Sequence, residues 1–366
     1  MGQKIFKERI NQGFSEIQKE KKINTLLVVC GISCRKLNIA TEVSAISIDQ
    51  IWFDEFSPNP TYESVEKGVK VFQKERCDGI LAIGGGSAMD VAKCIKLYST
   101  MNSLNYLEQE PVVNEVPLIA IPTTAGTGSE ATKFAVIYYQ GNKQSVVHDS
   151  IIPEYVFLMP GVLKELPIYQ KKATMMDAMC HAIESFWSVN STKESKAYSE
   201  QAIRKILSNM EGYLKGDEIA SNEMLIAAHI AGKAINITQT TAGHAMCYKI
   251  TSLYGLAHGH AAALCISKLW PYMLGHIEGC IDPRGKEYLQ KIFDELAAVF
   301  SCETSKAAAN YFIRLMEILE LDAPHIETEE QLTILAASVN ITRLINNPVK
   351  LSKDTLLELY RQILHG

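Results

Sequence analysis

The chain has 366 residues, 47% of them apolar and 21% charged, and its 36 Lys and Arg against 41 Asp and Glu give a formal charge of −5. This mixture is typical of a globular protein with about two domains, and it excludes a disordered, collagen-like or coiled-coil chain. The small acidic excess argues against a nucleic-acid-binding protein, which ordinarily carries a basic surplus.

The cellular setting follows from what the sequence lacks. No stretch reaches the roughly 18 uncharged apolar residues of a transmembrane helix. The first residues carry charges with no apolar core behind them, unlike a secretory signal. The nine cysteines contain no Cys-x-x-Cys pair, and their scattered spacing indicates reduced, mostly buried thiols. We therefore expect a cytoplasmic protein that does not bind a membrane.

Short apolar runs alternate with helical patterns through the first 160 residues. Helical spacing covers residues 62–77 and resumes at Ala88. Strands separated by helices pair in parallel, which predicts an α/β domain. The predicted strands are Leu26–Val29, Ile80–Ile83, Leu118–Ile121, Phe134–Tyr139 and Tyr155–Leu158.

Helical periodicity dominates after Pro160, so we expect an α/β domain over residues 1–162 and an all-helical domain over residues 163–366. Ser191 and Glu194 have the spacing of a capping box, which predicts a helix start there. The helical patterns break near three prolines, Pro271, Pro324 and Pro348.

Two loops follow predicted strands and are suited to binding phosphate. Gly84-Gly85-Gly86-Ser87 stands at a strand-to-helix junction, where glycines let backbone amides approach an anion. It is not the GxGxxG fingerprint, because Met89 occupies the place of the third glycine. The segment 122–130 combines threonines and glycines after the next strand. Each loop alone is more often a simple turn, but the pair favours a nucleotide site.

One carboxylate and three imidazoles form a candidate set of metal ligands. Asp177 and His181 stand four residues apart in a helical pattern and therefore share a face. His244 and His258 follow in a compact apolar segment. Such a set suits a divalent metal, whereas the Asp177–His181 pair alone is more often a simple hydrogen-bonded pair.

These residues carry a resemblance to the iron-containing (group III) alcohol dehydrogenases. Gly84–Lys93 resembles the family's GGGSxxDxAK motif, 122–130 resembles PTTAGTGSE, and the four candidate ligands resemble its metal ligands. The resemblance implies a dinucleotide-binding domain, a helical metal-binding domain and one catalytic metal in the cleft between them, Fe²⁺ or else Zn²⁺. By the same resemblance the nicotinamide cofactor contacts Gly84, Gly85, Gly86, Ser87, Asp90, Thr123, Thr124, Thr127 and Lys143.

The segments 187–192 and 240–255 resemble the phosphonoacetaldehyde reductase branch of this family. Many family members carry a histidine four residues after the third ligand, where this chain has Tyr248. Proton delivery then involves water, the cofactor ribose or His260, our predicted catalytic residue. Met159-Pro160 also replaces an Asp-Pro common in the family.

Lys249 lies between two candidate ligands, and a buried lysine needs an anionic partner. We predict that it binds a substrate phosphonate together with Thr251 and Ser252; alternatively it extends to solvent or pairs with an acid.

The first predicted strand leads into Gly31, Ser33 and Arg35, with no acid of the kind that selects NADH over NADPH. This favours acceptance of NADPH. If Arg35 points to solvent, both cofactors work.

The sequence thus predicts a metal-dependent NAD(P)H oxidoreductase that reduces a small aldehyde, phosphonoacetaldehyde before others, and that forms a homodimer or larger homo-oligomer. The alternatives are a general short-chain alcohol, lactaldehyde or propanediol dehydrogenase, a metal-dependent lyase of the dehydroquinate-synthase type, and a non-catalytic binding protein.

Overall fold

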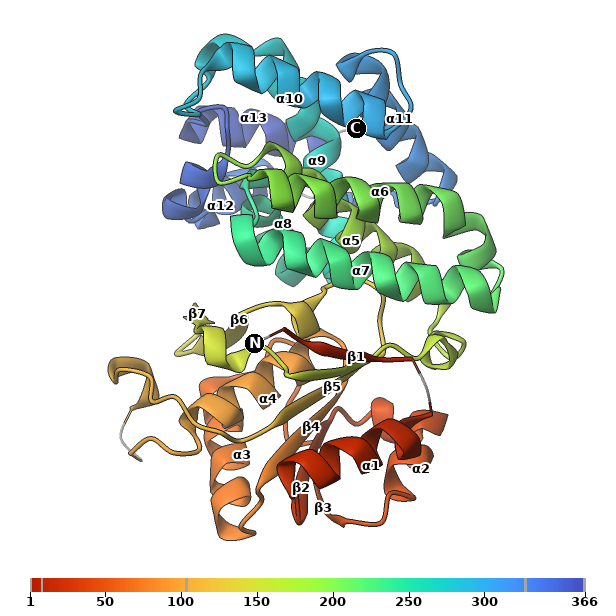
Figure 1. Ribbon diagram of the computed structural model, residues 1–366. Coiled ribbons are helices and arrows are strands. Elements are labelled where there is room, and N and C mark those ends of the chain that lie inside the picture. Colours follow the sequence, from red (N-terminus) through yellow and green to blue (C-terminus); the bar gives the residue numbers. More distant parts are fainter. Residues whose placement is uncertain (1, 8, 103–104, 326–327, 365–366) are drawn as a thin grey trace. The chain divides into compact units, whose positions relative to one another are not determined.

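The computed structural model describes residues 2–7, 9–102, 105–325 and 328–364. Its contacts divide the chain into two compact units, Met1–Leu166 and Pro167–Gly366 (Figure 1). The sequence analysis predicts the boundary between the α/β domain and the helical domain near residue 162.

A six-stranded sheet forms the centre of the first unit. Its order is β1-β8-β5-β4-β2-β3, and every neighbouring pair is parallel. The inner strands β2, β4 and β5 are almost wholly buried, because helices cover both faces of a parallel sheet. The predicted parallel α/β architecture is confirmed. The strands are β1 (Lys4–Phe6), β2 (Thr25–Cys30), β3 (Asp49–Phe53), β4 (Gly79–Gly84), β5 (Leu118–Pro122) and β8 (Tyr155–Phe157).

Four helices cover the sheet: α1 (Ile10–Lys21), α2 (Asn38–Ser44), α3 (Tyr62–Lys74) and α4 (Gly86–Tyr98). Figure 1 shows α1 and α2 on one face and α3 and α4 on the other. The connections from β2 and β4, which are neighbours, therefore leave toward opposite faces. This makes the carboxyl ends of β2 and β4 a topological switch point, where open α/β sheets bind ligands.

The predicted strand at 134–139 is not part of this sheet. It is β6 (Phe134–Tyr139), which pairs antiparallel with β7 (Asn142–Val147) in a separate hairpin. Gln140 and Gly141 have φ of +50° and +75°, the left-handed values of a tight two-residue turn. Parallel pairing was the wrong expectation here because no helix separates β6 from its partner.

Helices form the second unit, whose described part otherwise contains one isolated β-bridge, Cys280 to Val349. The helix α5 is buried along most of its length and packs against α6, α7 and α9. The helices are α5 (Ile168–Trp187), α6 (Lys193–Leu214), α7 (Glu218–Thr238), α8 (Ala242–Tyr254), α9 (His258–Gly275), α10 (Lys286–Val299), α11 (Ser305–Ile318), α12 (Glu329–Ser338) and α13 (Lys353–Leu364), with short 3₁₀ segments η6 (Ile277–Gly279) and η7 (Ile341–Asn346).

The helix predicted to start near residues 191–194 is α6, but two local details in this unit are wrong. The capping box of α6 uses Thr192 and Ser195, whose hydroxyls each accept the other residue's backbone amide at 3.1 and 2.9 Å. A serine hydroxyl thus does at the third position what a glutamate does in the usual box. Also, α9 continues through Pro271. Trp270 and Met273 beside it are fully buried, so packing stabilises this stretch although proline cannot donate a backbone hydrogen bond.

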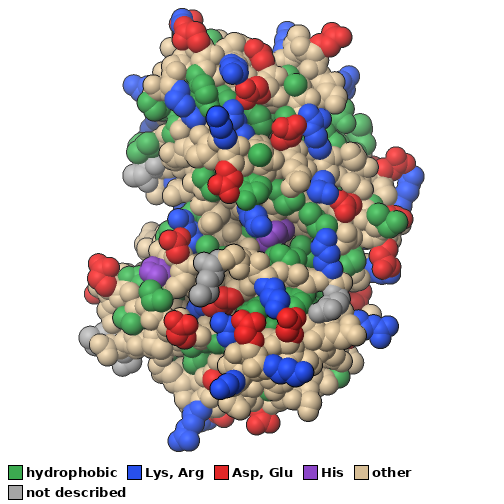
Figure 2. All heavy atoms as spheres, viewed as in Figure 1, with side chains coloured by type: hydrophobic (Ala, Val, Ile, Leu, Met, Phe, Trp, Pro, Cys, Tyr) green, Lys and Arg blue, Asp and Glu red, His purple; other side chains and the backbone are tan. Residues whose placement is uncertain are grey.

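Figure 2 shows acidic and basic side chains mixed over the visible face, without a broad basic area of the kind that binds a nucleic-acid backbone. Within the described residues, no helix has both the length and the apolar character that a membrane crossing requires.

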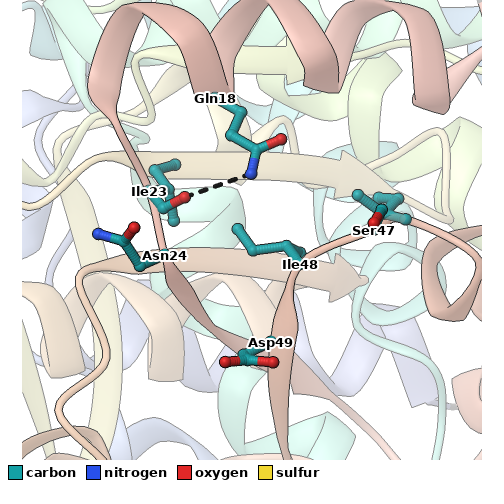
Figure 3. Close-up of a pocket in the computed structure, with 7 residues that line it drawn as sticks. Gln18, Ile23, Asn24, Ser47, Ile48 and Asp49 are labelled. Carbon is teal, nitrogen blue, oxygen red and sulfur yellow. Dashed lines mark hydrogen bonds between the residues drawn. The ribbon is translucent and has the colours of Figure 1, made fainter.

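A surface hollow opens at the amino ends of β2 and β3 (Figure 3). The Gln18 side-chain amide donates to the Ile23 carbonyl there at 3.4 Å. Ligands bind open α/β sheets at the carboxyl ends of the strands. This hollow lies at the amino ends, away from the expected site. Its lining is Gln18, Ile23, Asn24, Ile46, Ser47, Ile48 and Asp49.

Candidate functional site

The two predicted phosphate-binding loops lie side by side. The Thr123 amide donates to the Gly84 carbonyl at 3.0 Å. Gly84 has φ of +152°, and a Cβ there would lie 2.7 Å from the Ala88 Cβ, so only glycine fits this turn. Thr124 packs beside Gly85, whose Cβ would meet it at 3.4 Å. Backbone amides at the start of α4 therefore face a loop of hydroxyls, which suits a pyrophosphate.

The remaining members of these loops surround the same turn. A Cβ on Gly86 would lie 3.2 Å from Thr127 Cγ2, and Ser87 is partly exposed in the first turn of α4. Each of these residues therefore lies near the carboxyl ends of β4 and β5. Their contact with a cofactor stays a prediction.

Asp90 is hydrogen-bonded to the end of the 122–130 loop and to β6. One carboxylate oxygen accepts from the Ser129 hydroxyl at 3.0 Å and the other from the Val136 amide at 3.1 Å. Burial raises its pKa, while charges including those of Lys93 and Lys143 act to lower it. Lys143 lies on β7 opposite Tyr138. The structure thus places Lys143 near Asp90, and its reach to a ribose stays a prediction.

Lys93 holds the same end of the 122–130 loop, at Ser129, and the residues that follow it. It is fully buried, and its ammonium donates to the hydroxyls of Ser129 and Thr132 at 3.0 Å each and to the Phe134 carbonyl at 2.7 Å. Desolvation lowers the pKa of Lys93 to about 8, against the attraction of Asp90.

The segment after β2 holds an acid that the sequence analysis missed. Gly31 directly follows β2, and its carbonyl accepts hydrogen bonds from the amides of Cys34 and Arg35. The Ser33 side chain is exposed. Arg35 Nε lies 2.8 Å from Asp54 Oδ2, and its guanidinium lies 4.9 Å from the Trp52 ring. Asp54 directly follows β3, which pairs in parallel with β2. The carboxyl ends of the two strands therefore lie side by side, which brings the Asp54 carboxylate to Arg35. The expectation that no acidic residue lies near the end of the first predicted strand is therefore wrong.

Three of the four candidate metal ligands come together in the second unit. Asp177 from α5, His244 from α8 and His258 from α9 offer ligand atoms that all lie within 4.8 Å of one another. His244 Nε2 lies 3.4 Å from Asp177 Oδ1. Burial alone raises the pKa of Asp177, but the three neighbouring imidazoles lower it, so the carboxylate is charged. An ionised carboxylate beside buried imidazoles suits a divalent cation.

His181 is placed differently from the other three. Its ring stacks on that of His244, with centroids 4.4 Å apart and 14° between the planes. Among the described residues it is not part of the group whose ligand atoms converge. Its service as the fourth ligand stays a prediction.

Glu184, one turn beyond His181 on α5, orients His244. Its side chain is fully buried and accepts from the Thr241 amide and hydroxyl at 3.1 and 2.7 Å, from the His244 amide at 3.2 Å, and from His244 Nδ1. A carboxylate cannot donate, so a proton on Nδ1 is held toward Glu184, and Nε2 is the nitrogen that would bind a metal after losing its own proton. Burial lowers the pKa of His244, but Glu184 and Asp177 outweigh it and raise the value to about 9.

His260 lies two residues beyond His258 on α9, on roughly the opposite side of the helix, about 200° round it. Its Nδ1 lies 3.1 Å from the Tyr169 hydroxyl. That hydroxyl also accepts the Ala257 amide at 3.0 Å, which fixes its position beside the imidazole. Burial lowers the pKa of His260. Its role in proton delivery stays a prediction.

The predicted substrate residues occupy the second half of α8. Lys249 is partly buried, and no carboxylate of the described chain forms an ion pair with it. The Thr251 hydroxyl is buried without a hydrogen-bond partner among the described atoms. The exposed Ser252 hydroxyl donates to the Lys249 carbonyl at 3.2 Å.

Comparison with known proteins gives the family. Residues 4–160 match the model of iron-containing alcohol dehydrogenase, and residues 171–364 match that of the C-terminal part of the Fe-containing alcohol dehydrogenase family. A phosphonoacetaldehyde reductase from Streptomyces viridochromogenes is 30% identical over 313 residues, 81% of this chain and 78% of the relative. A lactaldehyde reductase from Escherichia coli is 31% identical over 67% of this chain and 65% of its own. The structure of sulfoacetaldehyde reductase from Bifidobacterium kashiwanohense in complex with NAD⁺ shares the fold, with a TM-score of 0.86 at 24% identity over 98% of this chain and 96% of that one.

Proposed function

The chain belongs to the iron-containing alcohol dehydrogenase family, and from this premise we propose that it reduces a small aldehyde to a primary alcohol with NAD(P)H and a divalent metal. The convergence of Asp177, His244 and His258, with Glu184 behind His244, is the observation that carries the proposal. The proposed substrate is phosphonoacetaldehyde, which the Streptomyces relative is named for and whose reduction gives 2-hydroxyethylphosphonate.

Asp177, His181, His244 and His258 would hold the metal, Fe²⁺ before Zn²⁺. A divalent ion there supplies Lewis acidity toward a carbonyl oxygen. The protein fixes the direction of the His244 ring through Glu184 and surrounds the ligands with buried side chains, which strengthens electrostatic interactions. The acidic end of the substrate is proposed to lie at the second half of α8, where the sequence analysis placed Lys249, Thr251 and Ser252, and His260 is proposed to assist proton delivery.

An aldehyde panel tests the proposal. The protein is loaded with Fe²⁺ or Zn²⁺ and supplied with NADH or NADPH and with phosphonoacetaldehyde, lactaldehyde or propionaldehyde. We expect oxidation of the reduced cofactor, fastest with phosphonoacetaldehyde. Equal rates on all three would favour the general short-chain alcohol dehydrogenase. No turnover of any aldehyde would overturn the proposal in favour of a lyase or a binding protein.

Glu184→Gln should weaken metal binding. An amide offers only one oxygen to the four donors that the Glu184 carboxylate satisfies, and it no longer favours the required His244 tautomer. Loss of such a partner typically costs about 10- to 100-fold in metal affinity. Competition with a chromophoric chelator measures it. Glu211→Gln, at an exposed glutamate of α6, is the control and should leave the affinity unchanged.

We propose that NADPH is accepted through Arg35 and that Asp54 limits this preference. Arg35 can pair with a 2′-phosphate, whereas the Asp54 carboxylate repels it and holds Arg35. Asp54→Asn should therefore raise the ratio of kcat/KM for NADPH over NADH by about tenfold, and Arg35→Ala should lower it by a similar factor. Glu55→Gln, whose exposed partner is Lys67, is the control. A wild-type preference for NADH above about tenfold contradicts the acceptance of NADPH.

A further inference from the structure

Arg343 brings a positive charge to the group of candidate ligands. It lies in η7, and its Nη1 donates to the Tyr248 hydroxyl at 3.0 Å. Its guanidinium carbon lies 5.4 Å from the centre of the Tyr248 ring. That ring in turn stacks on His258, with centroids 5.2 Å apart and 26° between the planes. The cation therefore stands one aromatic ring away from His258.

Nothing in the described part of the chain neutralises this charge. Arg343 is partly buried, and none of the ion pairs among the described residues involves it. The bond to Tyr248 uses one of the five guanidinium donors. A planar cation with donors to spare is suited to two-point binding of an oxyanion.

The segment that carries Arg343 is anchored at its end. The Asn346 carbonyl accepts the Val189 amide at 3.1 Å, and its side-chain oxygen accepts from Asn190 Nδ2 at 2.9 Å. Asn346 Nδ2 also donates to the Thr240 carbonyl at 3.3 Å. These bonds tie η7 to the loops before α6 and before α8. A cation on an anchored segment loses less freedom when it binds a ligand.

The other nearby cation is less well placed. On a regular helix Lys249 projects about 140° away from His244, whereas Tyr248 and Thr251 lie within about 40° of it. The buried Thr251 hydroxyl, without a partner among the described atoms, is thus on the same side of α8 as Tyr248. Arg343 and Thr251, rather than Lys249, converge on the face of α8 that carries the candidate ligand.

We propose that Arg343 binds the acidic group of the substrate and makes the enzyme selective for aldehydes that carry an oxyanion. Phosphonate, sulfonate and carboxylate share the chemistry that a guanidinium recognises. The inference rests on the proposed function, because it assumes reduction of an aldehyde whose oxygen lies at the candidate metal group. Tyr248 is then a positioning residue, which holds the guanidinium beside the His258 ring.

The test compares Arg343→Met and Arg343→Lys with the wild type. Steady-state kcat/KM is measured for phosphonoacetaldehyde, sulfoacetaldehyde, succinic semialdehyde and neutral propionaldehyde. Calorimetry measures binding of 2-hydroxyethylphosphonate to the metal-loaded protein. Arg343→Met should lose about 10- to 100-fold on the best anionic aldehyde and in 2-hydroxyethylphosphonate affinity, with less than about threefold loss on propionaldehyde. Arg343→Lys should recover part of the loss, and the substrate with the largest loss identifies the acidic group.

Arg314→Met removes an exposed arginine on α11 and should change none of these values. Equal losses on charged and neutral aldehydes would overturn the inference, since Arg343 would then only support the Tyr248 ring. So would a charge-selective loss in Lys249→Met that is absent in Arg343→Met. A wild type that reduces no aldehyde would instead overturn the proposed function, which separates the two failures.

Discussion

His258→Ala should abolish aldehyde reduction, lowering turnover at least about a thousandfold, while cofactor binding survives. His258 is the first residue of α9. Its ring stacks on Tyr248, and the Cys247 sulfur lies 3.6 Å from its Nδ1. Removal of this imidazole takes one of the three ligands whose atoms converge and leaves Asp177, His244 and the proposed ligand His181, so a divalent ion is held less tightly.

Three measurements check this prediction: turnover of the aldehyde, metal content by elemental analysis and NADH binding by fluorescence. The control is His276→Ala, which removes an exposed histidine that stacks on Tyr272 after the end of α9. It should keep full activity and metal content. Wild-type turnover by His258→Ala, or by protein stripped of metal, would show that the Asp177–His244–His258 group is not the reaction centre.

The functional residues that could be predicted from the sequence are those that stand a few positions apart along the chain. Asp177 and His181 share a helix face at a separation of four residues, and the glycines at 84–86 follow an apolar run directly. Such patterns depend on local geometry, which a sequence displays. The parallel sheet was predictable for the same reason, because its inner strands are continuous buried runs.

The residues that the sequence did not reveal act across long separations. Glu184 reaches His244 from another helix, Asp54 reaches Arg35 from the next strand, and Arg343 reaches Tyr248 from η7. Each is an ordinary charged residue in the sequence, and only the fold supplies its partner. Their identification needed tertiary contacts, not a longer motif.

The missed strands have a different cause. β1 and β3 are short edge strands that are partly exposed, and their apolar runs, Ile5-Phe6 and Ile51–Phe53, are shorter than the runs of the inner strands. The β6–β7 hairpin did leave a signal, Gly141 between two β-prone segments. Its turn could have been predicted from that glycine.

Gly259 stands between His258 and His260, where α9 packs closely against α5. A Cβ at this position would lie 2.1 Å from the Ala173 carbonyl oxygen, 2.5 Å from Asp177 Cβ and 2.8 Å from the Asp177 amide nitrogen. Two of these three atoms are backbone, so a rotamer change cannot relieve the overlap. The absence of a side chain at Gly259 is thus what allows Asp177 and His258 to come within ligand distance of a common point.

Gly259→Ala should therefore damage both stability and the metal group. Forcing extra volume into a packed interface typically costs about 1–3 kcal/mol, and here backbone contacts place the cost at the upper end. Separation of α5 from α9 also moves Asp177 away from His258, so we expect metal affinity to fall by about tenfold or more.

The matched control is Gly275→Ala at the other end of the same helix, where a Cβ would meet nothing within 4 Å. Thermal unfolding of the metal-free proteins separates the packing effect from the metal effect. Gly259→Ala should unfold at a lower temperature than Gly275→Ala, and its metal affinity should fall while that of the control does not. If the two variants match in unfolding temperature and in metal affinity, close contact of α5 and α9 at Gly259 is not what holds Asp177 and His258 together.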